Sequence, residues 1–200
     1  ISINALFPHK LAEMCAKHNT RLIHISTDCV FSGKKRNYVE SDISDAYDLY
    51  GRTKYLGEVT GNGCLTIRTS IVGRQLSGTS GLFEWFLSQK GSVCGYRKTI
   101  FSGLTTYALA KIIKVIIEGH KTVDGLYHIS SKPINKYDLL KRLKTTLNLD
   151  IEIIPDDSIV IDRSLDSTKF IELTHIEIPT WDEMIDEFAQ RVPHYEKLRY

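Results

Sequence analysis

The chain has 200 residues, of which 42% are hydrophobic, and its 26 basic and 24 acidic residues give a net charge of +2. This length suits one domain with a sizeable core, and the balanced charge gives no electrostatic footprint for nucleic acid. No apolar run reaches the roughly 18 residues that span a membrane. We therefore expect a cytoplasmic globular protein that has neither nucleic acid nor a membrane as a partner.

The four cysteines and seven histidines are scattered along the chain. The sequence has no Cys-x-x-Cys pair and no His-x-x-x-His pair, the spacings on which metal sites are usually built. We expect reduced cysteines and no metal.

The first half of the chain predicts alternating helices and strands. The apolar pattern indicates a helix over 4–19, a buried strand over 21–26, a helix over 50–60 closed by Gly61-Asn62-Gly63, and a strand over 64–70. The polar segment over 31–48 predicts a functional or lid-like loop. Such alternation is typical of a parallel sheet covered by helices, so the expected fold class is α/β.

The second half predicts shorter elements and more isolated strands. Helices are expected over 82–89, 105–118, 135–147 and 180–190, and strands over 93–96, 126–129 and 151–154. Asn135 suits an N-cap, and the residues from Thr180 to Glu183 have the pattern of a capping box. These features indicate a smaller lobe added to the core from about residue 93 onward.

One group of polar residues is suited to carbonyl chemistry. Ser26-Thr27-Asp28 ends the β-branched strand, and Tyr50 and Lys54 lie one helical turn apart in the next helix. A phenol has a reference pKa of about 10, and a neighbouring positive charge lowers that pKa by favouring the ionised form. Tyr50 is therefore a candidate acid with Lys54 as its partner, and Thr27 offers a second hydrogen bond to a carbonyl oxygen.

The spacing of Tyr50 and Lys54 is not distinctive by itself. The pairs Tyr107–Lys111 and Tyr137–Lys141 have the same spacing, but they lie in amphipathic helix patterns that packing explains. Tyr50 instead follows a polar loop and a strand that ends in Ser-Thr-Asp. The carboxyl ends of parallel strands usually carry the site, so position singles out Tyr50.

Six stretches of the sequence match one family in order and spacing. They are residues 3–5 (INA), 26–33 (STDCVFSG), 50–58 (YGRTKYLGE), 67–73 (IRTSIVG), 103–106 (GLTT) and 162–167 (DRSLDS). Together they resemble the extended short-chain dehydrogenase/reductases and, among these, the dTDP-4-dehydrorhamnose reductase-like sugar-nucleotide reductases. The resemblance implies part of a Rossmann-like parallel sheet over 1–92, without its N-terminal βαβ part, and a small C-terminal α+β substrate lobe over 93–200. The helix at 105–119 is expected to pack back on the core.

The activity implied by the resemblance is that of an NAD(P)-dependent enzyme. It reduces the 4-keto group of a nucleotide-activated deoxysugar with NADP or NAD as cofactor, in the synthesis of cell-surface polysaccharide precursors. Tyr50 would donate the proton, Lys54 would lower the pKa of Tyr50 and bind the nicotinamide ribose, and Thr27 would hold the carbonyl oxygen. Further cofactor contacts are implied for Asn4, Ser26, Thr69 and Ser70, and further substrate contacts for Asp28, Cys29, Ile71 and Arg163.

Two of these residues have a second interpretation. Asn4 suits a plain helix N-cap equally well. Arg163 either reaches a phosphate group or lies in a solvated turn before a short helix.

The sequence departs from the family pattern in three places. Cys29 stands where the family usually has an aromatic residue, and Ile71 stands where it often has Trp, which leaves the identity of the sugar open. None of the thirteen glycines forms the Gly-rich turn that a dinucleotide pyrophosphate needs. We therefore expect the chain to match the C-terminal two-thirds of a reductase and to be inactive as an isolated segment.

Two other functions fit the same residues. A non-catalytic regulatory or binding subunit would use the sheet as a scaffold, and an epimerase would share Tyr50 and Lys54. The expected small-molecule partner is a nucleotide sugar, and a homodimer is left open.

Overall fold

The central sheet of the molecule is parallel. The computed structural model describes residues 1–61, 63–78 and 81–198, so Asn62 of the predicted turn lies outside the described residues. Strand β1 (Leu22–Ile25) pairs in parallel with β2 (Cys64–Arg68), and β2 pairs in parallel with β7 (Gly125–His128). The expected α/β class with a parallel sheet is confirmed.

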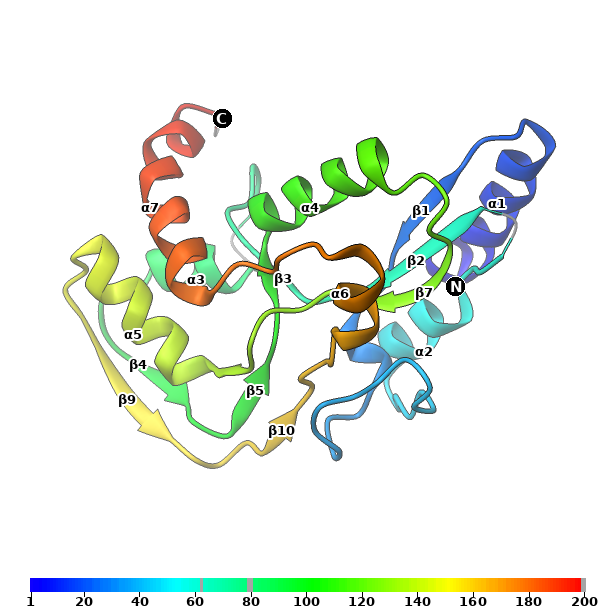
Figure 1. Ribbon diagram of the computed structural model, residues 1–200. Helices are drawn as coiled ribbons and strands as arrows, with labels where there is room; N and C mark the ends of the chain where they lie inside the picture. The colour runs from blue at the N-terminus through cyan, green and yellow to red at the C-terminus, as the bar shows by residue number, and fades with distance from the viewer. Residues whose placement is uncertain (62, 79–80, 199–200) are drawn as a thin grey trace.

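Helices α1 (Phe7–Lys17) and α2 (Leu49–Leu56) lie at the sheet end of the molecule (Figure 1). A π-helical turn, Ser2–Leu6, precedes α1, so Asn4 lies inside this turn and the N-cap interpretation of Asn4 is wrong. Helix α2 ends at Leu56 rather than near 60. At the next residue, Gly57, the backbone packs so closely on the carbonyl oxygen of Asn4 that a Cβ atom would overlap it. The helix stops where its backbone meets the π-helical turn.

The second half of the chain contains short paired strands. Strand β4 (Gly91–Tyr96) pairs in parallel with β9 (Ile151–Asp156), and the shorter strands are β3 (Ile71–Val72), β5 (Thr99–Phe101), β6 (Leu104–Thr105), β8 (Ile134–Asn135) and β10 (Ile161–Asp162). Strand β5 pairs in parallel with β10 and antiparallel with β8, and β3 pairs in parallel with β6. The sequence missed these five strands because two or three residues are too few to show a period.

Four helices of the second half begin close to where the sequence predicts them. They are α3 (Leu82–Leu87), α4 (Thr106–Gly119), α5 (Lys136–Leu147) and α7 (Trp181–Leu198), whereas no range was predicted for the short helix α6 (Thr168–Thr174). The Asn135 side chain accepts a hydrogen bond from the Asp138 N–H at 2.7 Å, which confirms the N-cap. Thr180 and Glu183 form the capping box, since each side chain accepts from the other's N–H. Within the described residues, no helix is long and apolar enough to cross a membrane.

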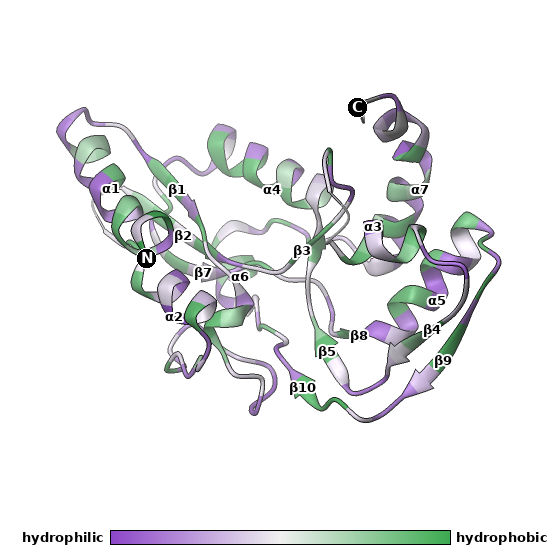
Figure 2. Ribbon diagram, turned by 180° about the vertical axis from the view of Figure 1, so that it is seen from behind, coloured by the Kyte–Doolittle hydropathy of each residue, from purple (hydrophilic) through white to green (hydrophobic). Residues whose placement is uncertain are grey.

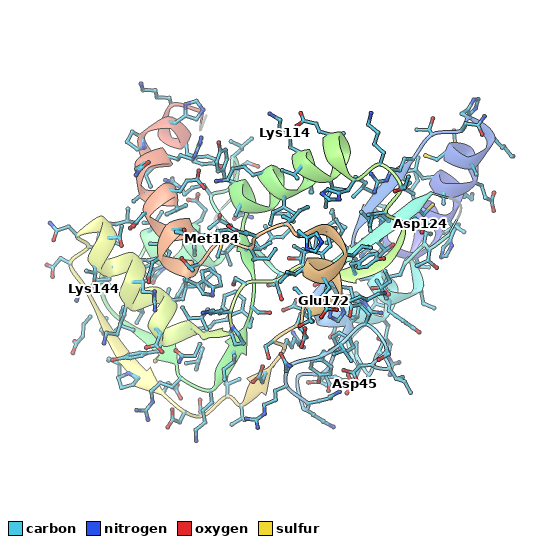
Figure 3. The ribbon with its side chains drawn as sticks, in the orientation of Figure 1. Asp45, Lys114, Asp124, Lys144, Glu172 and Met184 are labelled. Atoms are coloured by element: carbon cyan, nitrogen blue, oxygen red, sulfur yellow. The ribbon has the colours of Figure 1, made fainter. Side chains whose placement is uncertain are left out.

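One large cluster of buried side chains extends from the sheet into the second half of the chain. It contains Leu65 and Ile67 of β2, Ile112 and Ile116 of α4, and Met184 of α7. Apolar and polar residues alternate along α4 and α5 (Figure 2), and Figure 3 shows Met184 on α7 and Lys114 on the outer side of α4. Helix α4 thus packs on the core with one face and meets solvent with the other.

Candidate active site

The candidate site lies at the carboxyl ends of β1 and β2. Beyond β1, the Ser26 N–H donates to the Ile67 carbonyl at 2.7 Å and the Asp28 N–H to the Thr69 carbonyl at 3.1 Å. Thr27 therefore stays in extended backbone between them and caps a 3₁₀ turn, Asp28–Val30, by accepting from the Cys29 N–H at 3.1 Å. The paired strand ends fix where the Thr27 hydroxyl lies.

The start of α2 is pressed against this 3₁₀ turn. Asp48 caps the helix by accepting from the Gly51 N–H at 2.8 Å. A Cβ atom at Gly51 would overlap the carbonyl oxygen of Cys29 and come within 2.7 Å of the Ala46 Cβ. Glycine at this position lets the helix approach closely, and the approach places Tyr50 beside Thr27.

Replacing Gly51 by Ala is expected to destabilise the chain by about 1–3 kcal/mol, because the added methyl group has no space. Gly119→Ala is the matched control, since a Cβ at Gly119 would meet no atom within 4 Å at the end of α4. The control is expected to be neutral or to stabilise by up to about 1 kcal/mol, the difference in helix propensity. Urea unfolding of both variants measures this. Equal stability of the two variants would show that the fold does not need the close approach of α2 to the 3₁₀ turn.

The Tyr50 phenol is about half exposed, and its pKa is raised above the ordinary value. Burial is the largest cause; the Thr27 side chain acts in the opposite direction, and Cys29, Asp28 and Asp48 raise the pKa further. The predicted lowering by Lys54 does not occur in this structure. A phenol is already protonated near neutral pH at its ordinary pKa of about 10, so Tyr50 is in the form that can donate a proton, and the raised pKa makes it a weaker acid in this structure.

Lys54 points to the end of β1 from the same face of α2. Its Nζ donates to the carbonyl oxygen of Ile25 at 2.7 Å. Burial lowers the pKa of the ammonium, and Glu58 opposes that change. Because an ammonium carries three N–H donors and Ile25 is its single acceptor among the described residues, two donors remain for a ligand.

A buried carboxylate joins the three segments that carry the site. Glu58 Oε1 accepts from Ser26 Oγ at 2.6 Å and from Arg68 Nε at 2.8 Å, and Glu58 Oε2 accepts from Arg68 Nη2 at 2.7 Å. The side chains of Arg68 and Glu58 are only 2% and 7% exposed. Neither residue was predicted from the sequence to belong to the site, although Glu58 follows Lys54 by four positions.

The loop over 31–48 is anchored to the body of the protein through Arg68. The Arg68 guanidinium lies 5.1 Å from the ring of Phe31, which stacks on Tyr38 at 4.1 Å. Within the loop, Asp45 accepts from the Ser32 N–H at 2.7 Å, and Figure 3 shows where Asp45 lies. The expected lid-like loop is thus held to β2 through Phe31 and Tyr38, whereas residues 34–37 and Ile43 within it are exposed.

His128 of β7 completes this buried group and gives it a pH dependence. Its pKa is lowered from 6.5 to about 4, mainly by burial and then by the charge of Arg68. Between pH 6.5 and 4 the unfolded chain binds a proton that the folded chain does not, so the folded state loses stability as the pH falls. The expected loss is about 3 kcal/mol, since each pKa unit corresponds to about 1.4 kcal/mol.

Urea unfolding between pH 7 and pH 4 tests this expectation, with roughly 0.5-unit steps across the titration range. His128→Gln is expected to flatten the dependence, whereas His18→Gln, at an exposed position, should keep it. His24 also has a pKa of about 4, so it contributes to the pH dependence of stability in the unchanged protein and in both variants. An unchanged slope in His128→Gln would contradict this account.

Four of the predicted substrate residues line one pocket of about 430 Å³. Asp28, Cys29 and Ile71 line its sheet side, and Arg163 lines the side formed by the second half of the chain. Ser70, predicted as a cofactor contact, also lines the pocket, whereas Thr27, Tyr50 and Lys54 do not and adjoin it through Asp28 and Cys29. Lys136 lines the pocket too, and no motif in the sequence identifies it.

Arg163 follows β10 and is not in a solvated turn. Its N–H donates to the Ile100 carbonyl at 3.0 Å, and its Nη1 donates to the Cys29 thiol sulfur at 3.4 Å. The next residue, Ser164, is 2% exposed. The solvated-turn interpretation is wrong because the backbone here belongs to the β5–β10 sheet and carries the side chain into the pocket.

The remaining predicted cofactor residues are more dispersed. Asn4 Nδ2 donates to Thr53 Oγ1 at 3.5 Å, a long contact between the π-helical turn and α2. The Ser26 hydroxyl is engaged by Glu58, and Thr69 is buried directly after β2. The structure thus places Ser26 and Thr69 at the carboxyl ends of β1 and β2, and it places Asn4 in the turn that contacts Thr53 of α2.

The two other Tyr–Lys pairs lie at the starts of α4 and α5, after the short strands β6 and β8, and not at the ends of β1 and β2. Lys111 Nζ is 5.0 Å from the ring of Tyr107 on α4, and Lys141 Nζ is 5.3 Å from the ring of Tyr137 on α5. Both are cation–π contacts along a helix surface. Neither pair has a strand-end hydroxyl of the kind that Thr27 presents to Tyr50.

Comparison with known proteins agrees with this arrangement. The chain is 29% identical over 151 residues to the dTDP-4-dehydrorhamnose reductase of Aggregatibacter actinomycetemcomitans, an alignment that covers 68% of this chain and 50% of the relative. The chain thus spans about half the length of this curated relative.

Two solved structures share the fold. The dTDP-4-dehydrorhamnose reductase of Bacillus anthracis in complex with NADP superposes with a TM-score of 0.81 at 21% identity, covering 95% of this chain and 72% of that one. A hypothetical dTDP-4-dehydrorhamnose reductase from Sulfolobus tokodaii gives 0.75 at 27% identity, covering 88% and 66%. A family model described as the RmlD substrate binding domain matches residues 1–193. With this match over nearly its whole length, the chain belongs to the RmlD substrate binding domain family.

Proposed function

We propose that this chain provides the acid–base and sugar-binding part of an NAD(P)H-dependent reductase. The substrate is the 4-keto group of a nucleotide-activated deoxysugar, as in the synthesis of cell-surface polysaccharide precursors. The observation that carries the proposal is the meeting of Tyr50 and Lys54 with the Thr27 strand end, beside a pocket lined by Asp28 and Arg163. The names of the matched relatives support the same substrate class.

The proposed chemistry starts from the carbonyl oxygen of the sugar. Thr27 and Tyr50 bind this oxygen, and Tyr50 transfers its proton to the oxygen as negative charge develops there. The nicotinamide cofactor, when bound, supplies the hydride that reduces carbon 4. The ketone becomes a secondary alcohol, and the Tyr50 phenolate that results regains a proton from solvent.

The residues present fit the nicotinamide-ribose end of the cofactor. Lys54 keeps two N–H donors for ribose hydroxyls, and Tyr50 is exposed next to it. Thr69 and Ser70 are proposed to lie near the nicotinamide, with Ser26 contributing its main chain because its hydroxyl donates to Glu58. Asn4 is proposed to contact the cofactor from below, from the π-helical turn that packs on Gly57.

The division of the chain follows the same proposal. Residues 1–92 would carry the dinucleotide side and residues 93–200 most of the substrate side, with Arg163 and Ile71 facing each other across the pocket. A nucleotide sugar is the proposed small-molecule partner, and a second copy of the chain remains a proposed partner for assembly.

An assay of the protein that carries this chain tests the function. With a reduced nicotinamide cofactor and a nucleotide-linked 4-keto sugar, we expect one cofactor to be oxidised for each sugar reduced. An epimerase would convert the sugar without net oxidation of the cofactor. A scaffold would change neither, and either of these results would refute the reductase.

A further inference from the structure

Lys136 places a second positive charge in the pocket, which it lines together with Asp28. It is the first residue of α5, and Asn135, the cap of that helix, fixes the start of the helix beside β5. Its side chain lines the pocket and interacts electrostatically with Asp28, Cys29 and Arg163. Its Nζ lies 6.0 Å from the centre of the Phe101 ring.

The Lys136 ammonium lacks an anionic partner. Within the described residues it has no carboxylate within 4.0 Å and no hydrogen-bond acceptor, although it is partly buried. Burial lowers its pKa, with Asp28 and Cys29 acting in the opposite direction. Removing an ammonium from water without pairing it costs free energy that an anionic ligand would recover.

Arg163 is also incompletely bonded. Its Nε is buried without a hydrogen-bond partner, and its Nη1 donates to the Cys29 sulfur, a weak acceptor. Lys136 and Arg163 therefore line the same pocket, and both have N–H donors without a hydrogen-bond acceptor among the described residues.

Asp28 does not neutralise this pair. Among the described lining residues it is the single carboxylate, and it forms no ion pair within 4.0 Å with either cation. Burial raises the pKa of Asp28, so its charge is held less firmly than that of an exposed carboxylate. With two cations and at most one anion, the lining carries net positive charge.

We propose that Lys136 is a substrate-binding residue that binds, together with Arg163, the diphosphate of the nucleotide-linked sugar. The ligand class rests on the proposed function, whereas the assignment of Lys136 rests on the pocket. Arginine binds a phosphate through its planar fork and lysine through a compact point charge, so together they suit adjacent phosphates.

Isothermal titration of the protein that carries this chain with dTDP, inorganic pyrophosphate and thymidine tests the proposal. Lys136→Met is expected to weaken dTDP and pyrophosphate binding by about tenfold or more, the effect of losing one charge-assisted contact. Thymidine binding should stay unchanged. Lys136→Arg should keep most of the affinity for dTDP because it keeps the charge.

Lys141→Met is the matched control, because Lys141 lies on the same helix, is exposed and stacks on Tyr137. Its dTDP affinity should stay within about twofold of the unchanged protein. Thermal melts of the ligand-free protein separate binding from folding: Lys136→Met should melt at the same or a higher temperature, since it removes an unpaired, partly buried charge.

Unchanged dTDP affinity in Lys136→Met, or an equal loss in Lys141→Met, would overturn this inference and leave the reductase proposal standing. Absence of dTDP binding by the unchanged protein would overturn this inference, and the catalytic assay decides the reductase proposal separately. Loss of reduction in the catalytic assay together with normal Lys136-dependent dTDP binding would overturn the reductase proposal alone.

Discussion

Replacing Tyr50 by Phe is expected to lower kcat for ketone reduction by about 10²–10⁴-fold, the usual effect of a positioned acid. The change removes one hydroxyl and leaves the ring, so the fold and the KM for the sugar should change little. A tyrosine phenol is protonated at neutral pH, and Phe has no proton to give. Steady-state kinetics of the protein that carries this chain measures the effect.

Tyr107→Phe is the control for this experiment. Tyr107 has the same spacing to a lysine, with Lys111 Nζ 5.0 Å from its ring, but it lies on α4 and not at the ends of β1 and β2. Its kcat should stay within about twofold of the unchanged protein, as for surface substitutions in general. If Tyr50→Phe were as active as this control, the assignment of Tyr50 as the proton donor would be wrong.

Replacing Arg68 by Met is expected to cost about 3–5 kcal/mol of folding stability, because it leaves a buried carboxylate without its partner. Glu58 would keep a single hydrogen bond of the three that it now accepts, the one from Ser26. The double variant Arg68→Met with Glu58→Gln should recover part of the loss, since no unpaired charge remains. Urea unfolding gives the free energies.

Lys114→Met provides the comparison for a surface ion pair. Lys114 and Glu118 are 72% and 65% exposed, and Figure 3 shows Lys114 on the outer side of α4. Its loss should be below about 1 kcal/mol. A similar small loss for Arg68→Met would mean that the Arg68–Glu58 pair does not hold β1, α2 and β2 together.

The sequence predicted the long elements well because their periodicity is strong. Helices α4 and α5 each bury a regular face, β2 is buried at every position, and the caps at Asn135 and Thr180 follow from local hydrogen bonding. The end of α2 was misjudged because it is set by contact with the Asn4 backbone, which is distant in sequence. Tertiary contact, rather than propensity, ends this helix.

The candidate site was predictable where it follows from strand ends and less so where it depends on packing. Thr27 and Tyr50 come from adjacent elements, so their meeting follows from the order of a parallel sheet. The pKa direction of Tyr50 was wrong because Lys54 hydrogen-bonds Ile25, while burial dominates around the phenol. Lys136 reaches the pocket because β8 pairs with β5, a contact between distant parts of the sequence that no local pattern predicts.

Cys29 shows how one departure from the family pattern bears on the pocket. Its thiol sulfur accepts from Arg163 at 3.4 Å, so the residue at this position touches the side chain proposed to bind phosphate. Burial and the charge of Asp28 raise the pKa of the thiol, which keeps it protonated and unreactive at neutral pH. We therefore interpret Cys29 as shaping the pocket rather than taking part in the chemistry.

Transfer of deuterium tests the central claim most directly. The protein that carries this chain is incubated with a nucleotide-linked 4-keto sugar and a reduced nicotinamide cofactor that is deuterated at the transferred position. The product is then examined by mass spectrometry and NMR. We predict one deuterium at carbon 4 of the sugar for each cofactor oxidised, with the same labelled product formed about 10²–10⁴-fold more slowly by Tyr50→Phe. Sugar product without deuterium at carbon 4 would contradict the account.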